Sequence, residues 1–443
     1  MDAPGFAMVW WRCVHPKGAP LKQRLWCAAA CLAVLLAFAH SCSSTSGPAT
    51  DPAARPAAAQ GGGPTAVTAP AVISPEVHAD RTVTLRLRAP DASSVTISGD
   101  LGMRVLEMDG RGVWSFTTAA LAPDIYMYFF QVDGKQMADP GNPDRKGTAE
   151  SLVTVPGTPA MPWENRDVPH GKVEQVFSQS KAFGAPRRYT VYTPPSAGAS
   201  LGVGAGAAPG TAASAAPGAA PGAAPGAAPG AAAPALPVLF LLHGYTDDDS
   251  SWTAVGKAGL IADNLLADGK IKPLLIVMPH GQMDSYATFE EAFSASFQEK
   301  LEQQILSEII PYIQTTYGAA SDAAHRAIAG NSMGGMQAAF IGLNHPETFS
   351  TIGLWSSAIF VQPSDLLSKL AAAPNDLTHS FRFIHVAVGQ EDTTFINSSR
   401  ALDGFLSAQK IPHELLVTAG GHSWVVWRRY LVDFLQRFSP ATP

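Results

Sequence analysis

Gly330–Gly335 reads Gly-Asn-Ser-Met-Gly-Gly, and this stretch decides the fold. It follows an apolar run that ends at Ala329 and precedes a segment, beginning at Met336, that favours a helix. In a Gly-x-Ser-x-Gly turn a strand bends sharply into a helix, and only small flanking residues leave room for an exposed serine hydroxyl. The stretch therefore predicts a strand, a nucleophile at Ser332 and a helix, in that order.

The segments around this turn repeat one pattern, an apolar strand followed by a loop and an amphipathic helix. After a first strand at residues 187–193, strands are expected at residues 238–242, 274–278, 327–329, 351–355, 383–388 and 415–418. Helices are expected at residues 260–267, 297–317, 333–343, 365–371, 399–409 and 425–438. The strands are mostly apolar throughout, as strands buried on both faces are. The alternation predicts a doubly wound α/β sheet for residues 158–443, with its site at the carboxyl ends of the strands.

The sequence pattern of residues 76–157 predicts a separate domain. From Thr82 the apolar and polar residues alternate strictly, which is typical of a half-buried strand, and Asp133-Gly134 marks a hairpin. About six or seven short strands in about 80 residues favour a small antiparallel β-sandwich. Its aromatic side chains between Trp114 and Phe130 are expected to form the core, and a platform that stacks on sugars is the alternative.

Three segments do not have the composition of a folded domain. Residues 1–41 combine basic residues with an apolar run too short to span a membrane, which predicts an export signal. Cleavage after Ala39 would give ordinary secretion, whereas the run to Cys42 resembles a bacterial lipoprotein signal, and the tether that follows favours the lipoprotein. Residues 42–75 are predicted to be a flexible tether. Residues 196–235 repeat Pro-Gly-Ala-Ala and are predicted to be a disordered insert.

Composition excludes several classes of function. The net charge of -6 and the absence of basic runs make nucleic acid a poor partner. All four cysteines lie at or before Cys42, so the predicted folded domains have no disulfide and no thiolate metal site. The chain has no His-Glu-x-x-His motif and no phosphate-binding loop. We therefore expect no metal and no cofactor.

A serine nucleophile needs a base and an acid that orients the base, and these follow the serine in the order acid, histidine. His422 comes just after the last predicted strand, behind Gly420-Gly421, and is the expected base. The acid should lie on the loop after residues 383–388, where Glu391 and Asp392 both qualify. The residues alone leave this choice open.

The tetrahedral intermediate of acyl transfer needs two preorganised N–H donors. We expect one from the amide of Met333, directly after the nucleophile, and one from the amide of Tyr245, in the turn after residues 238–242. His243 should shape that turn and take no part in proton transfer. Tryptophans that could line an acyl pocket, or simply pack, are Trp252, Trp355 and Trp424.

Two resemblances extend this interpretation. The runs at residues 238–244, 326–335 and 420–424 resemble carbohydrate esterase family 1, which includes feruloyl and acetylxylan esterases, enterochelin esterases and mycolyltransferases. The resemblance implies an α/β hydrolase fold and selects Asp392 through the family's Gly-x-x-Asp pattern. Asn331 replaces the leucine often found before the serine. Residues 76–157 resemble the immunoglobulin-like domain related to family 48 carbohydrate-binding modules, through Ala89-Pro90-Asp91, Gly112-Val113-Trp114 and Val132-Asp133-Gly134.

The resulting hypothesis is an exported serine esterase that removes feruloyl or acetyl groups from a plant polysaccharide such as xylan. A siderophore esterase or an acyltransferase would use the same residues. The hypothesis from another class is a carbohydrate-binding protein whose hydrolase domain is a non-catalytic scaffold. The expected partners are an ester substrate, a carbohydrate contacted by the N-terminal domain, and a membrane only through a lipid on Cys42.

Overall fold

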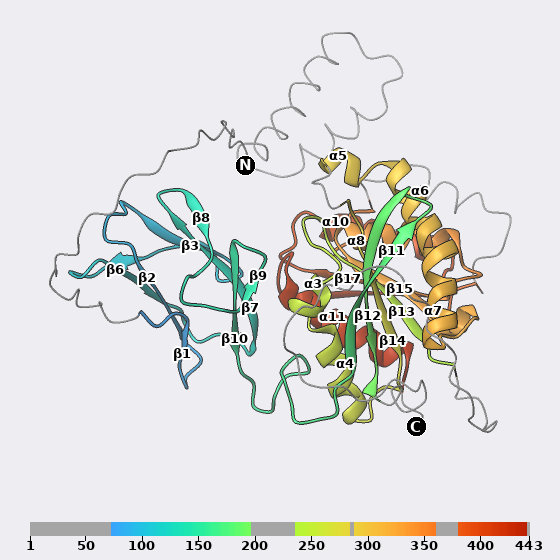
Figure 1. Cartoon of the computed structure of the whole chain (residues 1–443), viewed down its shortest axis with the longest axis horizontal. Coiled ribbons are helices and arrows are strands. Elements are labelled where there is room, and N and C mark those ends of the chain that lie inside the picture. The colour runs from blue at the N-terminus through green and yellow to red at the C-terminus, as the bar shows by residue number, and fades with distance from the viewer. Residues whose placement is uncertain (1–71, 196–234, 284–287, 360–379, 441–443) are drawn as a thin grey trace, which may run out of the picture. The chain divides into compact units, whose positions relative to one another are not determined.

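The computed structural model describes residues 72–195, 235–283, 288–359 and 380–440, which all fall within one compact unit (Figure 1). The predicted export signal, almost all of the tether and the insert, and the predicted helix at residues 365–371 lie outside the described residues. Among the residues that are described, no helix combines the length and apolar character that a membrane span requires.

The N-terminal domain is built from antiparallel strands in two sheets. One sheet has the order β1-β2-β6-β5 and the other β4-β3-β7-β10-β9, with β8 paired to β7. The strands are β1 (Glu76–Val77), β2 (Val83–Arg88), β3 (Val95–Gly99), β4 (Arg104–Val105), β5 (Glu107–Met108), β6 (Val113–Thr117), β7 (Asp124–Val132), β8 (Lys135–Met137), β9 (Arg145–Lys146) and β10 (Glu150–Val155). The predicted all-β architecture is confirmed.

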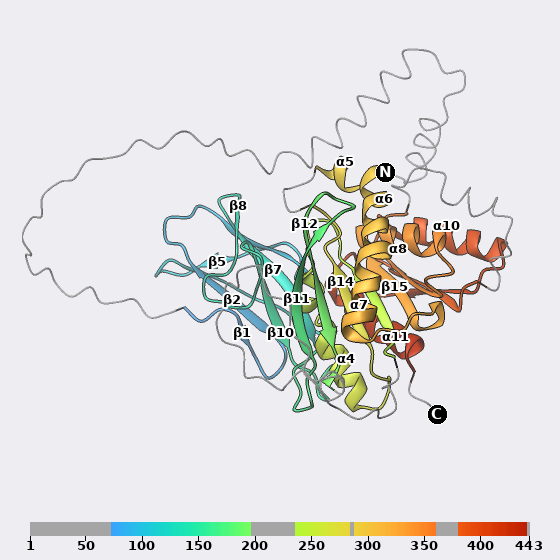
Figure 2. The same ribbon diagram turned by 45° about the vertical axis from the view of Figure 1, so that its right-hand side comes forward.

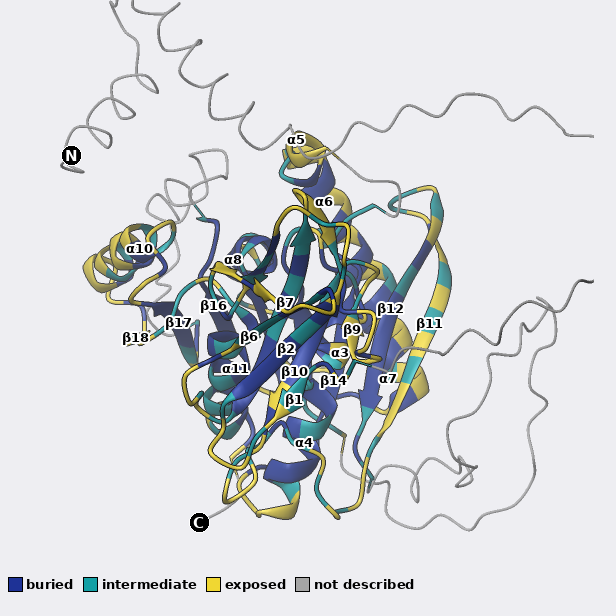
Figure 3. Cartoon of the chain, turned by 90° about the vertical axis from the view of Figure 1, so that its left-hand side faces the viewer, coloured by how far each residue is buried: buried dark blue, intermediate teal, exposed yellow. Residues whose placement is uncertain are grey.

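The two sheets share one core, which contains several aromatic residues of this domain. Leu85 and Trp114 from one sheet pack in the same cluster as Tyr128, Phe130 and Val153 from the other. Tyr128 and Phe130 are fully buried and Trp114 is 8% exposed. These side chains are core residues, and Figure 3 shows the buried positions along the strands. Buried in this way, Trp114, Tyr128 and Phe130 favour the core alternative over a platform that stacks on sugars.

The domain begins a few residues before the predicted boundary. Ser74 is buried, donates a hydrogen bond to Asp139 Oδ2 at 2.5 Å and accepts one from the amide of Arg86 at 2.9 Å. The tether prediction therefore extends too far, because residues 72–75 are part of the sandwich.

The second domain is an eight-stranded sheet in the order β11-β12-β14-β13-β15-β16-β17-β18. The six strands β13 to β18 pair in parallel. At the other edge, β12 pairs antiparallel with β14 and β11 pairs antiparallel with β12. Their bounds are β11 (Lys172–Ser180), β12 (Ala185–Thr193), β13 (Val238–Leu242), β14 (Leu275–Pro279), β15 (Arg326–Asn331), β16 (Thr351–Trp355), β17 (Phe383–Gly389) and β18 (His413–Thr418). The prediction that the sheet begins at residues 187–193 was wrong, because β11 precedes it. This edge strand alternates exposed and half-buried residues, so it lacks the apolar run of a central strand.

Helices cover both faces of the sheet, as a doubly wound fold requires (Figure 2). One core contains side chains of α6, α7, α8 and α10, and the other contains side chains of α3, α4 and α11. The helices are α3 (Ser251–Ala254), α4 (Ala258–Ala267), α5 (Phe289–Ala292), α6 (Ala295–Gln304), α7 (Ile310–Tyr317), α8 (Met333–Asn344), α10 (Ile396–Ala408) and α11 (Trp424–Phe438). A π-helical turn joins α6 to α7, just before Pro311, which has no N–H to donate. The predicted α/β hydrolase fold is confirmed.

Candidate active site

The predicted nucleophile lies in a strained turn between β15 and α8. Ser332 has φ 55° and ψ -117°, a conformation that non-glycine residues rarely adopt. A Cβ atom on Gly330 would lie 2.4 Å from the carbonyl carbon of Gly334, and one on Gly334 would lie 2.4 Å from Leu242 O. Both glycines are required by this close approach, as the sequence predicted. The strain is located at the residue that the motif selects.

Asp392 and His422 are joined by a hydrogen bond. The distance between His422 Nδ1 and Asp392 Oδ2 is 2.8 Å, and the carboxylate is 1% exposed. A carboxylate oxygen accepts, so His422 donates from Nδ1, and Nε2 is the ring nitrogen that Asp392 does not engage. Glu391 points elsewhere, since its carboxylate accepts from the amide of Gly420. The geometry thus separates the two acids that the residues alone left open.

The rings around His422 hold its orientation. Phe395 stacks on the imidazole with 4.6 Å between ring centroids, and Trp427 meets it edge to face at 4.9 Å. Trp427 Nε1 in turn donates to Ser356 Oγ at 3.3 Å, just after the end of β16. His422 is therefore fixed by an acid on one side and aromatic rings on the others, with a third of its side chain exposed.

Ser332, Asp392 and His422 come from the same edge of the sheet. They follow β15, β17 and β18, and the carboxyl ends of parallel strands meet at one edge. In the described part of the chain the Ser332 hydroxyl makes no hydrogen bond. Hydrogen bonds of catalytic groups are often long without substrate.

The two predicted oxyanion donors belong to segments that lie close to Ser332. Met333 is the first residue of α8. At this position the backbone N–H has no carbonyl acceptor within the helix. The turn with Tyr245 is also close, because a Cβ atom on Gly244 would lie 3.6 Å from Ser332 Cβ. Neither amide donates a hydrogen bond to any group that the structure describes.

His243 shapes this turn, as predicted. Its Nδ1 lies 2.8 Å from Gly244 O, and its Nε2 accepts from the amide of Gly281 at 2.9 Å. Burial lowers the pKa of His243, so the ring stays neutral and donates from Nδ1. Both ring nitrogens are used in holding two loops together.

Comparison with known proteins identifies the second domain. Residues 229–438 match the family described as "Putative esterase". The α/β domain belongs to this esterase family. The chain is 32% identical over 372 residues to an endo-1,4-beta-xylanase/feruloyl esterase of Xylanibacter ruminicola, across 82% of this chain and 45% of that protein. The chain therefore spans less than half the length of this relative.

Two further matches are a sequence relative and a solved structure. The chain is similar to an acetyl esterase of Caldicellulosiruptor saccharolyticus, 23% identical over 235 residues, which are 46% of this chain and 84% of that protein. The solved structure of the enterobactin esterase of Shigella flexneri is 19% identical, with a TM-score of 0.59 over 81% of this chain and 93% of its own. That likeness concerns the fold, and its extent reaches beyond the esterase domain into the N-terminal strands.

The three tryptophans suggested for the acyl pocket are core residues of the esterase domain. Trp252, Trp355 and Trp424 are at most 3% exposed, and Trp252 meets the other two edge to face. Trp252 Nε1 donates to Leu242 O, and Trp355 Nε1 donates to His385 Nδ1. Their burial favours the packing alternative.

A different aromatic group lies beside the nucleophile, and the sequence analysis missed it. Tyr245, Phe293 and Phe395 pack around the small cluster that contains Met333. Phe289 stacks on Phe293 at 4.3 Å and is 48% exposed. The Thr288-x-x-Glu291 capping box, which starts α5, is the sequence signal that would have placed these two phenylalanines on one helical turn.

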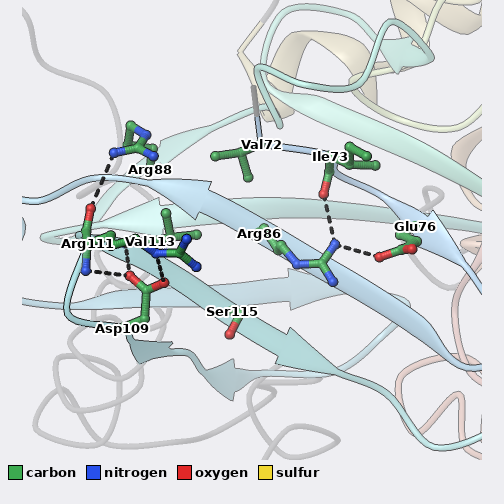
Figure 4. A pocket seen from close by; sticks show the side chains of 9 residues that line it. All are labelled: Val72, Ile73, Glu76, Arg86, Arg88, Asp109, Arg111, Val113 and Ser115. Carbon is green, nitrogen blue, oxygen red and sulfur yellow. Dashed lines mark hydrogen bonds and ion pairs between the residues drawn. The ribbon is translucent and has the colours of Figure 1, made fainter. Parts of the chain in front are cut away.

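A hollow of about 370 Å³ lies on the N-terminal domain, along β2 and β6 (Figure 4). Arg86 pairs with Glu76 at 2.7 Å, Arg111 pairs with Asp109 at 3.3 Å, and Arg88 donates to Arg111 O at 3.3 Å. The residues that line it are Val72, Ile73, Glu76, Arg86, Arg88, Asp109, Arg111, Val113 and Ser115. This lining has no aromatic ring on which a sugar could stack.

Proposed function

We propose that this protein is a serine carboxylic-ester hydrolase in which Ser332 is the nucleophile, His422 the base and Asp392 the acid that orients it. The observation that carries the proposal is the hydrogen bond between Asp392 and His422 at the sheet edge that also presents Ser332 in a strained turn. Membership of the esterase family supports the same reaction class.

In the first half of the reaction Ser332 Oγ attacks the ester carbonyl while its proton passes to His422 Nε2. The imidazolium formed is stabilised by Asp392, and the amides of Met333 and Tyr245 hold the oxyanion. Collapse breaks the bond to the alcohol, which leaves with the proton from His422, and an acyl-enzyme remains. Water then repeats the sequence, releases the acid and restores Ser332.

The substrate we propose is a feruloyl or acetyl ester of a plant polysaccharide such as xylan. The names of the two curated relatives describe a xylanase/feruloyl esterase and an acetyl esterase. Between these acyl groups, the aromatic side chains of Tyr245, Phe293 and Phe395 beside the nucleophile favour a planar aromatic acyl group.

We further propose that the protein is exported and is either released or held by a lipid on Cys42. The support is the composition of residues 1–42 alone. Membrane and soluble fractions of the producing cells, compared for the wild type and Cys42→Ser, test the anchor. Continued membrane attachment of Cys42→Ser would exclude it.

Initial rates on p-nitrophenyl acetate, methyl ferulate and a catecholate trilactone siderophore test the function. The variants are Ser332→Ala and, as a matched control, Ser357→Ala, a buried serine beside Gly335. We expect methyl ferulate to be cleaved best and Ser332→Ala alone to be inactive. Preference for the siderophore would indicate a siderophore esterase, and transfer to an added alcohol an acyltransferase. No cleavage by the wild type, together with retention on insoluble xylan, would indicate a non-catalytic binding protein.

A further inference from the structure

A lysine of the N-terminal domain reaches the turn that carries Tyr245. Lys146, on β9, has its Nζ 2.6 Å from Asp247 Oδ1 and 3.4 Å from Glu150 Oε2, which lies opposite it on β10. The side chains of Lys146 and Asp247 are 18% and 5% exposed. The contact with Asp247 is a close ion pair and lacks the angles of a directed hydrogen bond.

Asp247 closes the turn on its other side. Its amide donates to Gly244 O at 3.2 Å, and its main-chain carbonyl accepts from Gln282 Nε2 at 2.8 Å. Its Oδ2 would lie 3.3 Å from a Cβ atom on Gly244, so the carboxylate is folded back onto the turn. Whatever holds this carboxylate also holds the backbone between Gly244 and Asp247, where the Tyr245 amide lies.

The charge of Lys146 is maintained at this position. Burial lowers its pKa, but the charges of Asp247 and Glu150 outweigh burial, and the pKa lies above its usual value. A carboxylate that is almost excluded from water is unstable without a cation nearby, and it would move toward solvent if the cation were removed. Such a movement would carry the turn with it.

We propose that Lys146 is a positioning residue for the esterase reaction, and that by pairing with Asp247 it fixes the turn that aims the Tyr245 amide at the oxyanion. The proposal rests on the proposed function. It gives the N-terminal domain a part in building the active site, through a residue that does not touch the substrate.

The N-terminal domain also contacts the esterase domain through residues other than Lys146. Arg428 of α11 is fully buried and donates to Asp124 Oδ1 at 2.6 Å, at the start of β7. Ile125 and Leu152 of the N-terminal domain also belong to one of the two cores of the esterase domain. With these contacts in place, loss of Lys146 should act on the turn and leave the domain arrangement intact.

The test compares kcat and KM on p-nitrophenyl acetate for Lys146→Met, Lys146→Arg and Glu150→Gln in the full chain. Misplacement of one oxyanion donor lowers kcat more than substrate affinity, so we expect Lys146→Met to lose about 10- to 100-fold in kcat with KM within about threefold. Lys146→Arg should recover most of kcat. Glu150→Gln, which removes only the other carboxylate, should stay within about twofold.

The double variant Lys146→Met/Asp247→Asn separates positioning from general stability. If the two residues act as one pair, the double variant should lose no more kcat than Lys146→Met alone. A fall in melting temperature with unchanged kcat in Lys146→Met would overturn the proposal. So would additive losses. If Lys146→Met fails to fold, Asp247→Asn with Lys146 present replaces it. Wild-type activity that survives Ser332→Ala would instead overturn the proposed function.

Discussion

The hollow on the N-terminal domain and the carboxyl edge of the esterase sheet both gather polar side chains at the surface, but they use them differently. In the hollow, Arg86 and Arg111 each pair with a carboxylate of the same domain. At the sheet edge, His422 bonds Asp392 through one nitrogen only, and the Ser332 hydroxyl makes no hydrogen bond within the described residues. Groups that satisfy one another stabilise a surface, whereas groups with unused bonding capacity are available to a substrate.

Apart from loss of the nucleophile itself, the largest effect is expected at the acid. On the proposed mechanism Asp392→Asn loses the carboxylate that orients His422, so kcat should fall by about 10³- to 10⁴-fold. Glu391→Gln is the matched control, because it keeps an oxygen for the amide of Gly420 and should stay within a few-fold. Michaelis–Menten kinetics on p-nitrophenyl acetate measure both. Equal losses in the two variants would remove the distinction between Asp392 and Glu391.

The second prediction concerns the buried ion pair between Asp124 of the N-terminal domain and Arg428 of the esterase domain, and its contribution to stability. Asp124→Ala leaves Arg428 buried without its carboxylate, and we expect a loss of about 3–5 kcal/mol in the free energy of unfolding. Arg429 also pairs with Asp124 but is 40% exposed, so Arg429→Gln should cost less than about 1 kcal/mol. Urea denaturation gives both values. If Asp124→Ala were as mild as Arg429→Gln, the buried pair would not hold the domains together.

A smaller effect, on the pH dependence of stability, is expected from Asp100. Burial raises its pKa from 3.8 to about 6, against the opposing hydrogen bond from the Met127 amide. Between these values the folded protein keeps a proton that the unfolded chain has lost, so stability should fall as pH rises from about 4 to about 6. The upper limit is about 3 kcal/mol, and we expect less because Asp100 is partly exposed.

Asp100→Asn cannot ionise and should lack this loss. Urea midpoints of the wild type and Asp100→Asn at pH 4, 5, 6 and 7 measure the difference, which should favour the variant increasingly toward pH 7. Parallel curves for the two proteins over this range would contradict the assigned pKa.

The smallest effect is expected in the hollow. Glu76 pairs with Arg86 at a partly exposed position, and pairs that remain in contact with solvent contribute little to stability. Glu76→Gln should therefore leave the urea midpoint and kcat/KM on methyl ferulate unchanged within error. A marked fall in activity on feruloylated xylan, with methyl ferulate unaffected, would instead show that the hollow takes part in binding the polysaccharide.

The sequence predicted those parts of the fold that have a strong local pattern. β13 and β16 were predicted at their observed bounds because buried parallel strands are continuous apolar runs. The Ser332 turn was predicted because its glycines are required by close contacts within a few residues. β11 was missed because an edge strand with polar residues lacks that run.

The supporting residues of the site could not be predicted because their contacts are distant in sequence. Lys146 and Asp247 lie in different domains, about 100 residues apart in the sequence, and belong to no motif. The role of Phe395 could not be predicted either, because its stacking on His422 depends on the fold and not on a local sequence pattern. Trp252 was suggested for the pocket because indoles often line binding sites. In the structure it packs against Trp355 and Trp424 in the core.

The most direct test of the central claim is covalent labelling with diethyl p-nitrophenyl phosphate, followed by intact mass spectrometry and peptide mapping. The reagent traps a serine only when a base activates it. We predict one adduct per chain on the peptide with Ser332, none in Ser332→Ala, and labelling slowed by orders of magnitude in Asp392→Asn. An adduct on another residue, or full esterase activity without labelling of Ser332, would contradict the account.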